Sequence, residues 1–268
     1  MNDNKTHDFL QRVIGEKFSS NICCAFAYGS AFMKQAGCNP NQNVIDLILV
    51  VNDPVIFHQI NLSKNYNDYS FVKYFGTSGS WLNKWFHCTS AGVYYNPFIF
   101  FDGRYIKYGV VSKEKLIQDL YQWAYLYLAG RLHKPVKWVV PASNDDSKIS
   151  TGLNLNFENA IRAALLFLPD SFTEETFYRK ICDLSYNGDI RTWFNIDRSK
   201  SKKIVNNNFE QFQKLYHPFF EKFSHVFHFS NGKFLQDNSN QQVTNLFNGL
   251  PSSIQLAVNR LILPKIGS

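Results

Sequence analysis

Two short apolar runs near the N-terminus give the clearest pattern in this chain. Cys23–Tyr28 and Val44–Val51 have the length and composition of buried strands. The first run ends at Gly29-Ser30, where glycine permits a tight turn and the backbone N–H of Ser30 is placed to face an anion. The second run contains one charged residue, Asp46. A buried carboxylate needs a cation or hydrogen-bond donors, because desolvating it alone is costly.

The rest of the pattern up to residue 112 mixes helix with strand. We expect an amphipathic helix over Asp8–Phe18. A second helix should begin at Pro54 and run to about Tyr66, with Asp53 as its N-cap. Two apolar runs flank Asp102-Gly103, which predicts a β-hairpin with a tight turn.

The second half of the chain is predicted to be mainly helical. The expected elements are helices over Lys113–Leu132, Asn156–Leu168 and Thr173–Leu184, a linker over 141–152, and strands near 190–194 and 225–234. This order favours a winged-helix-like module. The predicted fold class is therefore α+β, with one domain over residues 1–112 and a mostly helical, winged-helix-like domain over 113–268.

Composition narrows the class of protein. Hydrophobic residues make up 45% of the 268 residues and charged residues 18%, which supports a packed core and excludes global disorder. The net charge of +7 favours anionic partners such as nucleic acid, nucleotides or acidic lipid. Aromatic residues reach 16%, which indicates either a well-filled core or a surface that faces a membrane. No apolar run approaches the roughly 18 residues of a transmembrane helix.

A phosphate-binding turn beside a buried carboxylate predicts nucleotidyl transfer. The layout is similar to that of the DNA polymerase β superfamily, where the turn holds the triphosphate and carboxylates on the next strand hold Mg²⁺. The usual second carboxylate stands two residues after the first, on the same strand face, and here that position is Ile48. Asp53 is the first alternative ligand, although its place as a helix cap explains it equally well. Mg²⁺ commonly keeps waters and binds few carboxylates.

Six segments together resemble the mitochondrial-type CDP-diacylglycerol synthases, the translocator assembly and maintenance family of phosphatidate cytidylyltransferases. They are AFAYGSAFMKQAG (25–37), VIDLILVVNDPVIFHQINLSKNYNDYS (44–70), AGVYYNP (91–97), YIKYGVV (105–111), LYLAGRLHKPVK (126–137) and LSYNGDIR (184–191). They occur in the family's order across both halves of the chain. The resemblance implies that CTP and phosphatidate give CDP-diacylglycerol and pyrophosphate with Mg²⁺, at an anionic membrane surface, for phosphatidylglycerol and cardiolipin synthesis.

The resemblance also implies roles for individual residues. Asp46 and Ser30 become the catalytic candidates, and Asp46 and Asp53 the metal ligands. The candidates for binding the nucleotide are Tyr28, Gly29, Ser30, Lys107, His58, Asn61 and Asn65, and those for the lipid phosphate are Arg131, Lys134 and Arg191. Simpler structural interpretations stay open. Lys107 can lie at a strand edge, the stripe from His58 to Asn65 can face solvent, and Arg131 can complement a helix dipole.

Two other functions compete with this one. A nucleotidyltransferase that acts on RNA or protein would use the same turn, although no RNA-binding motif is recognisable and we expect no nucleic-acid partner. A non-catalytic membrane adaptor would explain Ile48. The N-terminal residues match neither a signal peptide nor a transit peptide. The expected location is thus the membrane surface on the cytoplasmic side in a bacterium, or on the matrix side in a mitochondrion. The sequence does not indicate an oligomeric state.

Overall fold

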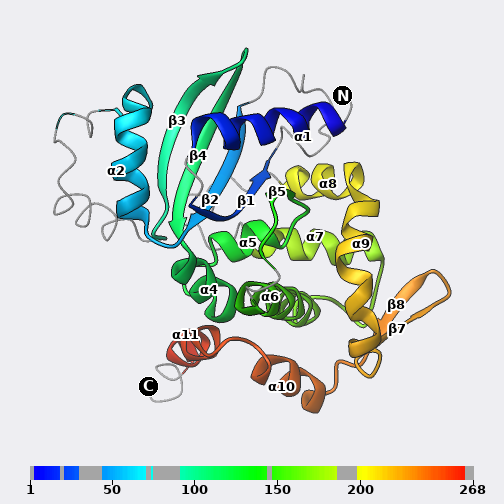
Figure 1. Ribbon diagram of the computed structural model, residues 1–268. Coiled ribbons are helices and arrows are strands. Elements are labelled where there is room, and N and C mark those ends of the chain that lie inside the picture. The colour runs from blue at the N-terminus through cyan, green and yellow to red at the C-terminus, as the bar shows by residue number, and fades with distance from the viewer. Residues whose placement is uncertain are drawn as a thin grey trace. The chain divides into compact units, whose positions relative to one another are not determined.

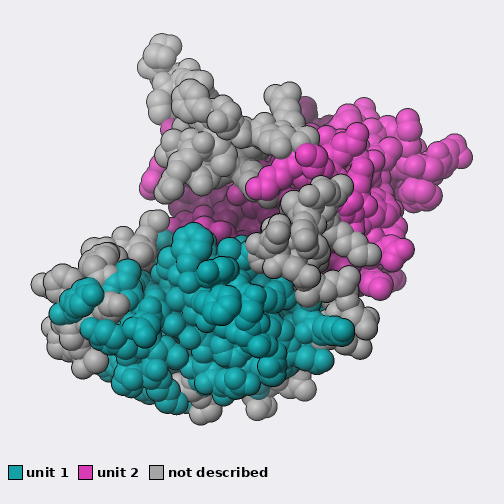
Figure 2. Space-filling model, turned by 90° about the horizontal axis from the view of Figure 1, so that it is seen from above, with its two compact units in different colours: residues 1–117, 136–149 teal, residues 118–135, 150–268 magenta. Residues whose placement is uncertain are grey.

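Two compact units make up this computed structural model (Figures 1 and 2). The structure describes residues 3–18, 21–29, 44–70, 74, 91–143, 147–185 and 198–262. Unit 1 comprises residues 1–117 and 136–149, and unit 2 comprises residues 118–135 and 150–268. The division differs from the predicted boundary after residue 112, because a strand over 137–140 returns to the sheet of unit 1. The predicted α+β class is confirmed.

A five-stranded sheet organises unit 1. Its helices and strands are α1 (Asp3–Arg12), the π-helical turn η1 (Val13–Lys17), β1 (Ile22–Tyr28), β2 (Ile45–Val51), α2 (Pro54–Lys64), the 3-10 turn η2 (Tyr66–Asp68), β3 (Tyr94–Phe101), β4 (Arg104–Ser112) and β5 (Lys137–Val140). The strand order is β3-β4-β2-β1-β5, in which β2 pairs with β4 in parallel and the other neighbours are antiparallel. β2 therefore lies at the centre of the sheet.

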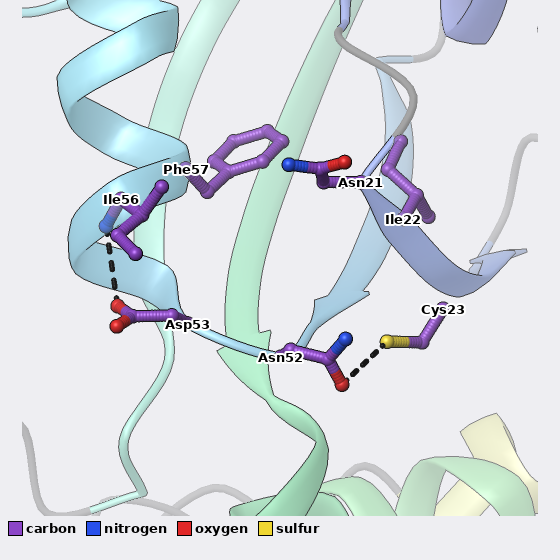
Figure 3. A pocket seen from close by; sticks show the side chains of 7 residues that line it. All are labelled: Asn21, Ile22, Cys23, Asn52, Asp53, Ile56 and Phe57. Atoms are coloured by element: carbon purple, nitrogen blue, oxygen red, sulfur yellow. Dashed lines mark hydrogen bonds between the residues drawn. The ribbon is translucent and has the colours of Figure 1, made fainter.

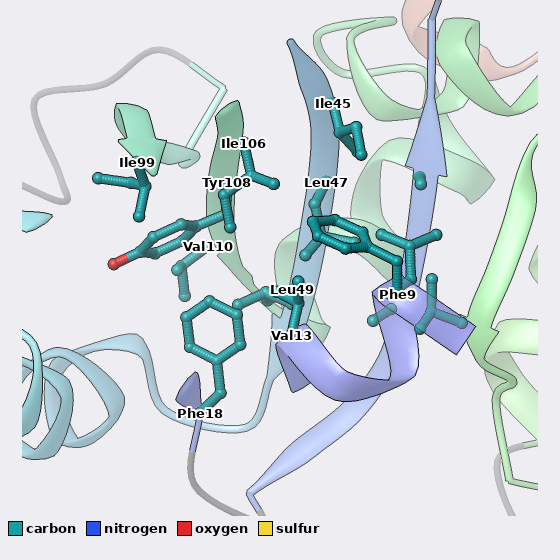
Figure 4. Close-up of a cluster of buried hydrophobic side chains, with 14 of the residues drawn as sticks. Phe9, Val13, Phe18, Ile45, Leu47, Leu49, Ile99, Ile106, Tyr108 and Val110 are labelled. Atoms are coloured by element: carbon teal, nitrogen blue, oxygen red, sulfur yellow. The ribbon is translucent and has the colours of Figure 1, made fainter. Parts of the chain in front are cut away.

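Alternate residues of the central strand face opposite sides of the sheet. Ile45, Leu47 and Leu49 point into the hydrophobic core, which they share with Phe9 of α1 (Figure 4). Phe57 of α2 belongs to the same core. Asp46 and Ile48 therefore belong to the other face. Each residue of the sheet therefore belongs either to the core face or to the opposite face, and Asp46 lies on the opposite face.

Local signals in the sequence set the ends of several elements. Asp53 caps α2, and its Oδ1 accepts hydrogen bonds from the backbone N–H groups of Val55 and Ile56 at 2.8 and 3.1 Å. The predicted hairpin forms from β3 and β4, with Asp102 and Gly103 both at positive φ in its turn. Because glycine and aspartate tolerate that conformation better than most residues, this turn was predictable from the sequence.

Unit 2 is mostly helical. Its elements are α4 (Lys113–Gln122, which begins in unit 1), α5 (Leu128–Leu132), α6 (Ser147–Leu165, which also begins in unit 1), β6 (Ser171–Phe172), α7 (Glu174–Leu184), α8 (Arg198–Asn207), α9 (Phe209–Phe220), the 3-10 turn η5 (Glu221–Phe223), β7 (Phe227–Ser230), β8 (Lys233–Gln236), α10 (Asn240–Asn248) and α11 (Ser252–Ile262). α6 starts inside the predicted linker, which corrects that prediction. Across the described ranges, no helix is both long and apolar enough to cross a membrane.

The single helix predicted over Lys113–Leu132 is wrong, because a buried carboxylate breaks it. The Asp119 side chain accepts hydrogen bonds from five successive backbone N–H groups, those of residues 125–129. Trp123 and Leu126 adopt positive φ in the connection between α4 and α5. Those hydrogen bonds satisfy the backbone donors at the start of α5. Helix α4 therefore ends at Gln122, and a new helix begins at Leu128.

A small sheet completes unit 2. Its strand order is β6-β8-β7, and β7 and β8 form a hairpin around Asn231-Gly232. This hairpin confirms strand structure in the predicted region 225–234. The strand predicted near residues 190–194 lies outside the described residues. The hairpin after α9 follows the expected order, whereas β6, between α6 and α7, was not predicted. The winged-helix-like assignment stays a prediction.

Candidate functional site

Four of the residues predicted to bind nucleotide or metal meet at one edge of the unit 1 sheet, where its inner strands begin or end. β1 ends at Tyr28 and Gly29 follows it, whereas β2 begins one residue before Asp46. In the sheet register, Asp46 lies opposite Tyr28 on one side and Lys107 on the other. Three adjacent strands thus bring together side chains that are far apart in the sequence.

Asp46 and Lys107 form an accessible ion pair. Lys107 Nζ lies 3.7 Å from Asp46 Oδ1, and the two side chains are 37% and 30% exposed. An ion pair this open contributes at most about 1 kcal/mol to stability, since water screens it. The fold does not depend on the pair, and both groups remain within reach of a ligand.

Gly29 is the residue that permits the chain to turn beside Asp46. Its φ is +86°, and a Cβ at this position would lie 3.1 Å from Asp46 Oδ2. Any side chain would therefore be strained and would press against the carboxylate. Ser30, the predicted partner of Gly29 in the turn, lies outside the described residues.

Tyr95 is a further member of the site that was not singled out from the sequence. Lys107 Nζ lies 4.4 Å from the centroid of the Tyr95 ring, and the hydroxyls of Tyr95 and Tyr28 lie 3.1 Å apart. Gly109 makes room for the ring, because a Cβ there would lie only 2.6 Å from Tyr95 Cε1. The sequence signal was Tyr95's place in the matching segment AGVYYNP, although its register on β4 was unknown.

Among the described residues, Asp46 is the carboxylate at this edge. Ile48, two residues after Asp46 on the same strand face, is fully buried and packs over Gly109. In the described part of the chain, no three His, Cys, Asp or Glu residues gather as a metal site. A cation held here would have Asp46 as its protein ligand and would take its remaining ligands from phosphate oxygens and water.

Asp53 does not share a site with Asp46. The strand from Asp46 to Val51 alone spans about 16 Å at roughly 3.3 Å per residue. Asp53 follows its far end, where it caps α2 and lines a separate pocket with Asn21, Ile22, Cys23, Asn52, Ile56 and Phe57 (Figure 3). Its position therefore argues against the predicted role as a second ligand of the same metal ion.

His58, Asn61 and Asn65 lie on the core side of the sheet, away from the Asp46 face. His58 Nδ1 lies 2.7 Å from the Tyr69 hydroxyl, and the Asn61 amide donates to the hydroxyls of Tyr69 and Tyr108 at 2.8 and 2.9 Å. Tyr108 and Lys107 are neighbours on β4 and so point to opposite faces. The structure does not bring these three residues to the Asp46–Lys107 pair.

The stripe on α2 instead forms a buried polar network. Asn65 donates to the Asn61 side chain and to the Lys17 carbonyl, both at 2.8 Å, and Lys17 pairs with Asp68 at 3.0 Å. Burial lowers the pKa of His58 to about 3, so this imidazole is neutral near pH 7. The network fixes α2 against β4, which is a structural role.

The two described cations predicted to bind the lipid phosphate lie one turn apart in unit 2. Arg131 donates to the Tyr127 carbonyl at 3.0 Å, and its guanidinium stands 3.7 Å from the centroid of the Tyr127 ring. Lys134 donates to the Gly130 carbonyl at 2.9 Å and to Ser185 Oγ at 2.5 Å. Burial lowers the pKa of Lys134 to about 8. Arg191 lies outside the described residues.

Comparison with known proteins gives one consistent result. A family described as "Phosphatidate cytidylyltransferase, mitochondrial" matches residues 10–265. The mouse protein of that name is 40% identical over 261 residues, which cover 95% of this chain and 75% of the mouse chain. The frog (Xenopus laevis) protein is 43% identical over 217 residues, covering 78% and 61%, and the human protein 39% over 259 residues, covering 94% and 56%. The chain therefore belongs to the family of mitochondrial phosphatidate cytidylyltransferases.

Proposed function

We propose that this chain transfers a cytidylyl group from CTP to phosphatidate, giving CDP-diacylglycerol and pyrophosphate. The observation that carries the proposal is the Asp46–Lys107 pair beside Gly29, at the edge of the sheet where a triphosphate and its cation would bind. The relatives are named for this activity, which favours it over transfer to RNA or protein.

The reaction needs no general base from the protein. A phosphate monoester has a second pKa near 6, so the phosphatidate phosphate is largely a dianion at neutral pH. One of its oxygens attacks the α-phosphorus of CTP and forms the new P–O bond. The bond between that phosphorus and the bridging oxygen of the β-phosphate breaks, and pyrophosphate leaves with the electron pair. Catalysis then consists of positioning two anions and stabilising the charge that develops.

The side chains at the sheet edge fit those tasks. Lys107 is proposed to bind the triphosphate, since its ammonium is held over the Tyr95 ring and stays partly exposed. Gly29 lets the backbone approach the phosphates, and the N–H of Ser30 is proposed to donate to them. Tyr28 supports the ring of Tyr95 through the contact between their hydroxyls.

Asp46 is proposed as the protein ligand of Mg²⁺. The carboxylate is 30% exposed and belongs to no cluster of three metal-ligating side chains among the described residues, which fits an ion that usually keeps several waters and takes most of its other ligands from substrate phosphates. When bound, Mg²⁺ would neutralise charge on the triphosphate and the leaving pyrophosphate. Asp46 would orient the triphosphate through the Mg²⁺ ion, while Gly29 keeps the approach to the carboxylate open.

The arrangement of β1, the following turn and β2 supports a polymerase β-like nucleotidyltransferase fold for unit 1. In that layout, the turn after the first strand and the acid on the next strand serve one nucleotide. Here Gly29 and Asp46 occupy those two places, and β1 and β2 pair directly.

Arg131, Lys134 and Arg191 are proposed to hold the phosphate of phosphatidate. Support comes from the partial burial of Lys134, which lowers its pKa, because an anion beside the ammonium would offset that cost. The Lys134→Gln variant should raise the KM for phosphatidate and leave the KM for CTP unchanged. Lys180→Gln, on α7 of the same unit, is the control. Equal KM values for phosphatidate in Lys134→Gln and the wild type would assign Lys134 to structure alone.

The relatives' names place those proteins in mitochondria, and we propose the matrix face of the inner membrane for this chain rather than a bacterial membrane. The product would enter phosphatidylglycerol and cardiolipin synthesis. Association with the membrane is proposed to be peripheral.

The test uses CTP labelled at the α-phosphate, with vesicles that contain phosphatidate or with RNA as acceptor. Label should move into the lipid phase in a Mg²⁺-dependent reaction, with equimolar pyrophosphate. Label in RNA instead would favour the alternative nucleotidyltransferase. Binding to vesicles without turnover on any acceptor would favour a membrane adaptor.

A further inference from the structure

Three aromatic side chains stand exposed on the β3–β4 hairpin. Phe98, Phe100 and Tyr105 are 72%, 62% and 53% exposed. Phe100 lies opposite Tyr105 in the register, and their ring centroids are 5.3 Å apart. Phe98 also adopts a φ of +57°, a conformation that is uncommon for a bulky residue. Packing against the described residues does not explain these three rings.

The opposite face of the same hairpin is held firmly. Phe101 packs edge-on against Phe9 of α1, and the Arg104 guanidinium stands 5.2 Å from the centroid of that ring. Arg12 also pairs with Asp102 in the hairpin turn. Because one face of the hairpin is anchored to α1, the three exposed rings are held in a fixed position and do not belong to a loose loop.

The exposed rings continue the face that carries the proposed nucleotide site. Tyr105 and Lys107 alternate with Ile106 on β4, so they share one face and lie about 7 Å apart. The bulge that contains Phe98 interrupts the register between Asn96 and Ile99. Tyr108 and Ile106 are the β4 partners of those two residues, so the bulge lies opposite Lys107. If the rings touched a membrane surface, a lipid headgroup in that surface could contact Lys107.

We infer that Phe98, Phe100 and Tyr105 dock this hairpin on the interfacial layer of the bilayer that holds the lipid substrate. This inference rests on the proposed function. Phosphatidate keeps its acyl chains in the membrane and presents its phosphate at the surface, so the reacting groups must come to headgroup level. Tyrosine favours that layer, where its ring lies in the apolar part and its hydroxyl in water, and phenylalanine can bury its ring at the boundary between headgroups and acyl chains.

The surroundings favour a lipid surface over a second copy of the chain. β3 is an edge strand of its sheet, and Pro97 and the bulge interrupt the row of groups that another strand would need. Lys107 lies on the same strand face as Tyr105, and the whole chain carries a net charge of +7. A lysine on the face of the aromatic side chains, in a chain with excess positive charge, complements an anionic phosphatidate surface.

The first test measures flotation of the full chain with vesicles of phosphatidylcholine that contain or lack phosphatidate. Each ring replaced by serine should weaken binding about tenfold, so the Phe98→Ser/Phe100→Ser variant should lose about a hundredfold. Phe167→Ser is the matched control, because Phe167 is 67% exposed in unit 2 and outside the hairpin. Tyr105→Ser is a second, milder variant, and thermal unfolding verifies that each variant folds.

The second test separates docking from catalysis by comparing vesicle-borne phosphatidate with a short-chain, water-soluble phosphatidate. The double variant should lose turnover on vesicles and keep wild-type kcat/KM on the soluble substrate. Unchanged vesicle binding in the folded double variant would overturn the inference, as would self-association of the wild type that the variant abolishes. Ring-dependent vesicle binding with no turnover on either substrate would instead leave docking in place and refute the proposed function.

Discussion

Lys107 stands over the ring of Tyr95, with its Nζ 4.4 Å from the ring centroid, and faces Asp46 from there. A ring face attracts an ammonium by about 0.5–2 kcal/mol, depending on how far water is excluded. The Tyr95 hydroxyl in turn meets that of Tyr28. Four adjacent strands therefore hold one lysine at a fixed place, so a triphosphate would meet an ammonium that is already positioned.

Asp46→Asn should abolish cytidylyl transfer and leave the fold intact. The change removes the charge that would bind the cation, whereas the 30% exposed side chain adds little to stability. Turnover with labelled CTP and thermal unfolding measure the two effects. Normal turnover would refute the assignment of Asp46 as the metal ligand.

Asp53→Asn is the matched control for that variant. Asparagine caps a helix about as well as aspartate, so both stability and turnover should stay close to wild type. If Asp53→Asn folded normally and lost turnover, Asp53 would return as a metal ligand despite its place at the far end of β2.

Lys107→Ala should raise the KM for CTP about tenfold or more, with a small effect on the free energy of unfolding. The lost interaction is one charge-assisted contact with phosphate, and its ion pair with Asp46 is too exposed to matter for folding. Lys64→Ala, at the exposed end of α2, should leave the CTP dependence unchanged. An unaltered KM in Lys107→Ala would make Lys107 a structural residue.

The strands and turns of the site were predictable because their signals are local. The apolar runs predicted β1 and β2, Asp53-Pro54 predicted the start of α2, and Asp102-Gly103 predicted the hairpin. Each signal acts through residues that are close in the sequence. The ends of two strands then suffice to bring Gly29 beside Asp46.

The roles of His58 and Asn61 were not predictable in the same way. Helical spacing places them on one face of α2, but it does not say what covers that face. The hydroxyls of Tyr69 and Tyr108 cover it, and these come from other elements. Asp119 presents the same difficulty, because no glycine or proline marks the helix break that its carboxylate stabilises.

Gly109→Ala should impair both folding and CTP binding. Its new Cβ would lie 2.6 Å from Tyr95 Cε1 and 2.8 Å from Val93 Cγ1, so those side chains must move. Overpacking of this kind costs about 1–3 kcal/mol, and displacement of Tyr95 would release Lys107. Urea denaturation and the KM for CTP measure the two effects.

The same substitution at Gly15 is the control, because a Cβ there meets nothing within 4 Å. Gly15→Ala should be neutral or slightly stabilising. A Gly109→Ala variant with the stability and KM of the wild type would show that Tyr95 does not position Lys107.

The stability of unit 2 should fall as the pH decreases from about 6.5, because of His133. This imidazole is fully buried, and burial together with the nearby Lys134 ammonium lowers its pKa to about 3. Below pH 6.5 the unfolded chain takes up a proton that the folded chain refuses, which costs about 1.4 kcal/mol per pH unit until the pH reaches about 3. Between pH 7 and pH 5 the expected loss is about 2 kcal/mol.

His133→Gln should remove that part of the pH dependence, even if it lowers stability at every pH. The Asn156 amide donates to the Ala129 carbonyl, so its oxygen faces His133 and accepts a hydrogen bond that a glutamine amide can also donate. Urea denaturation at pH 7 and pH 5 measures the difference, and His228→Gln, at an exposed position of β7, controls for the substitution itself. If His133→Gln lost as much stability between these pH values as the wild type, the acid sensitivity of the unit would have another source.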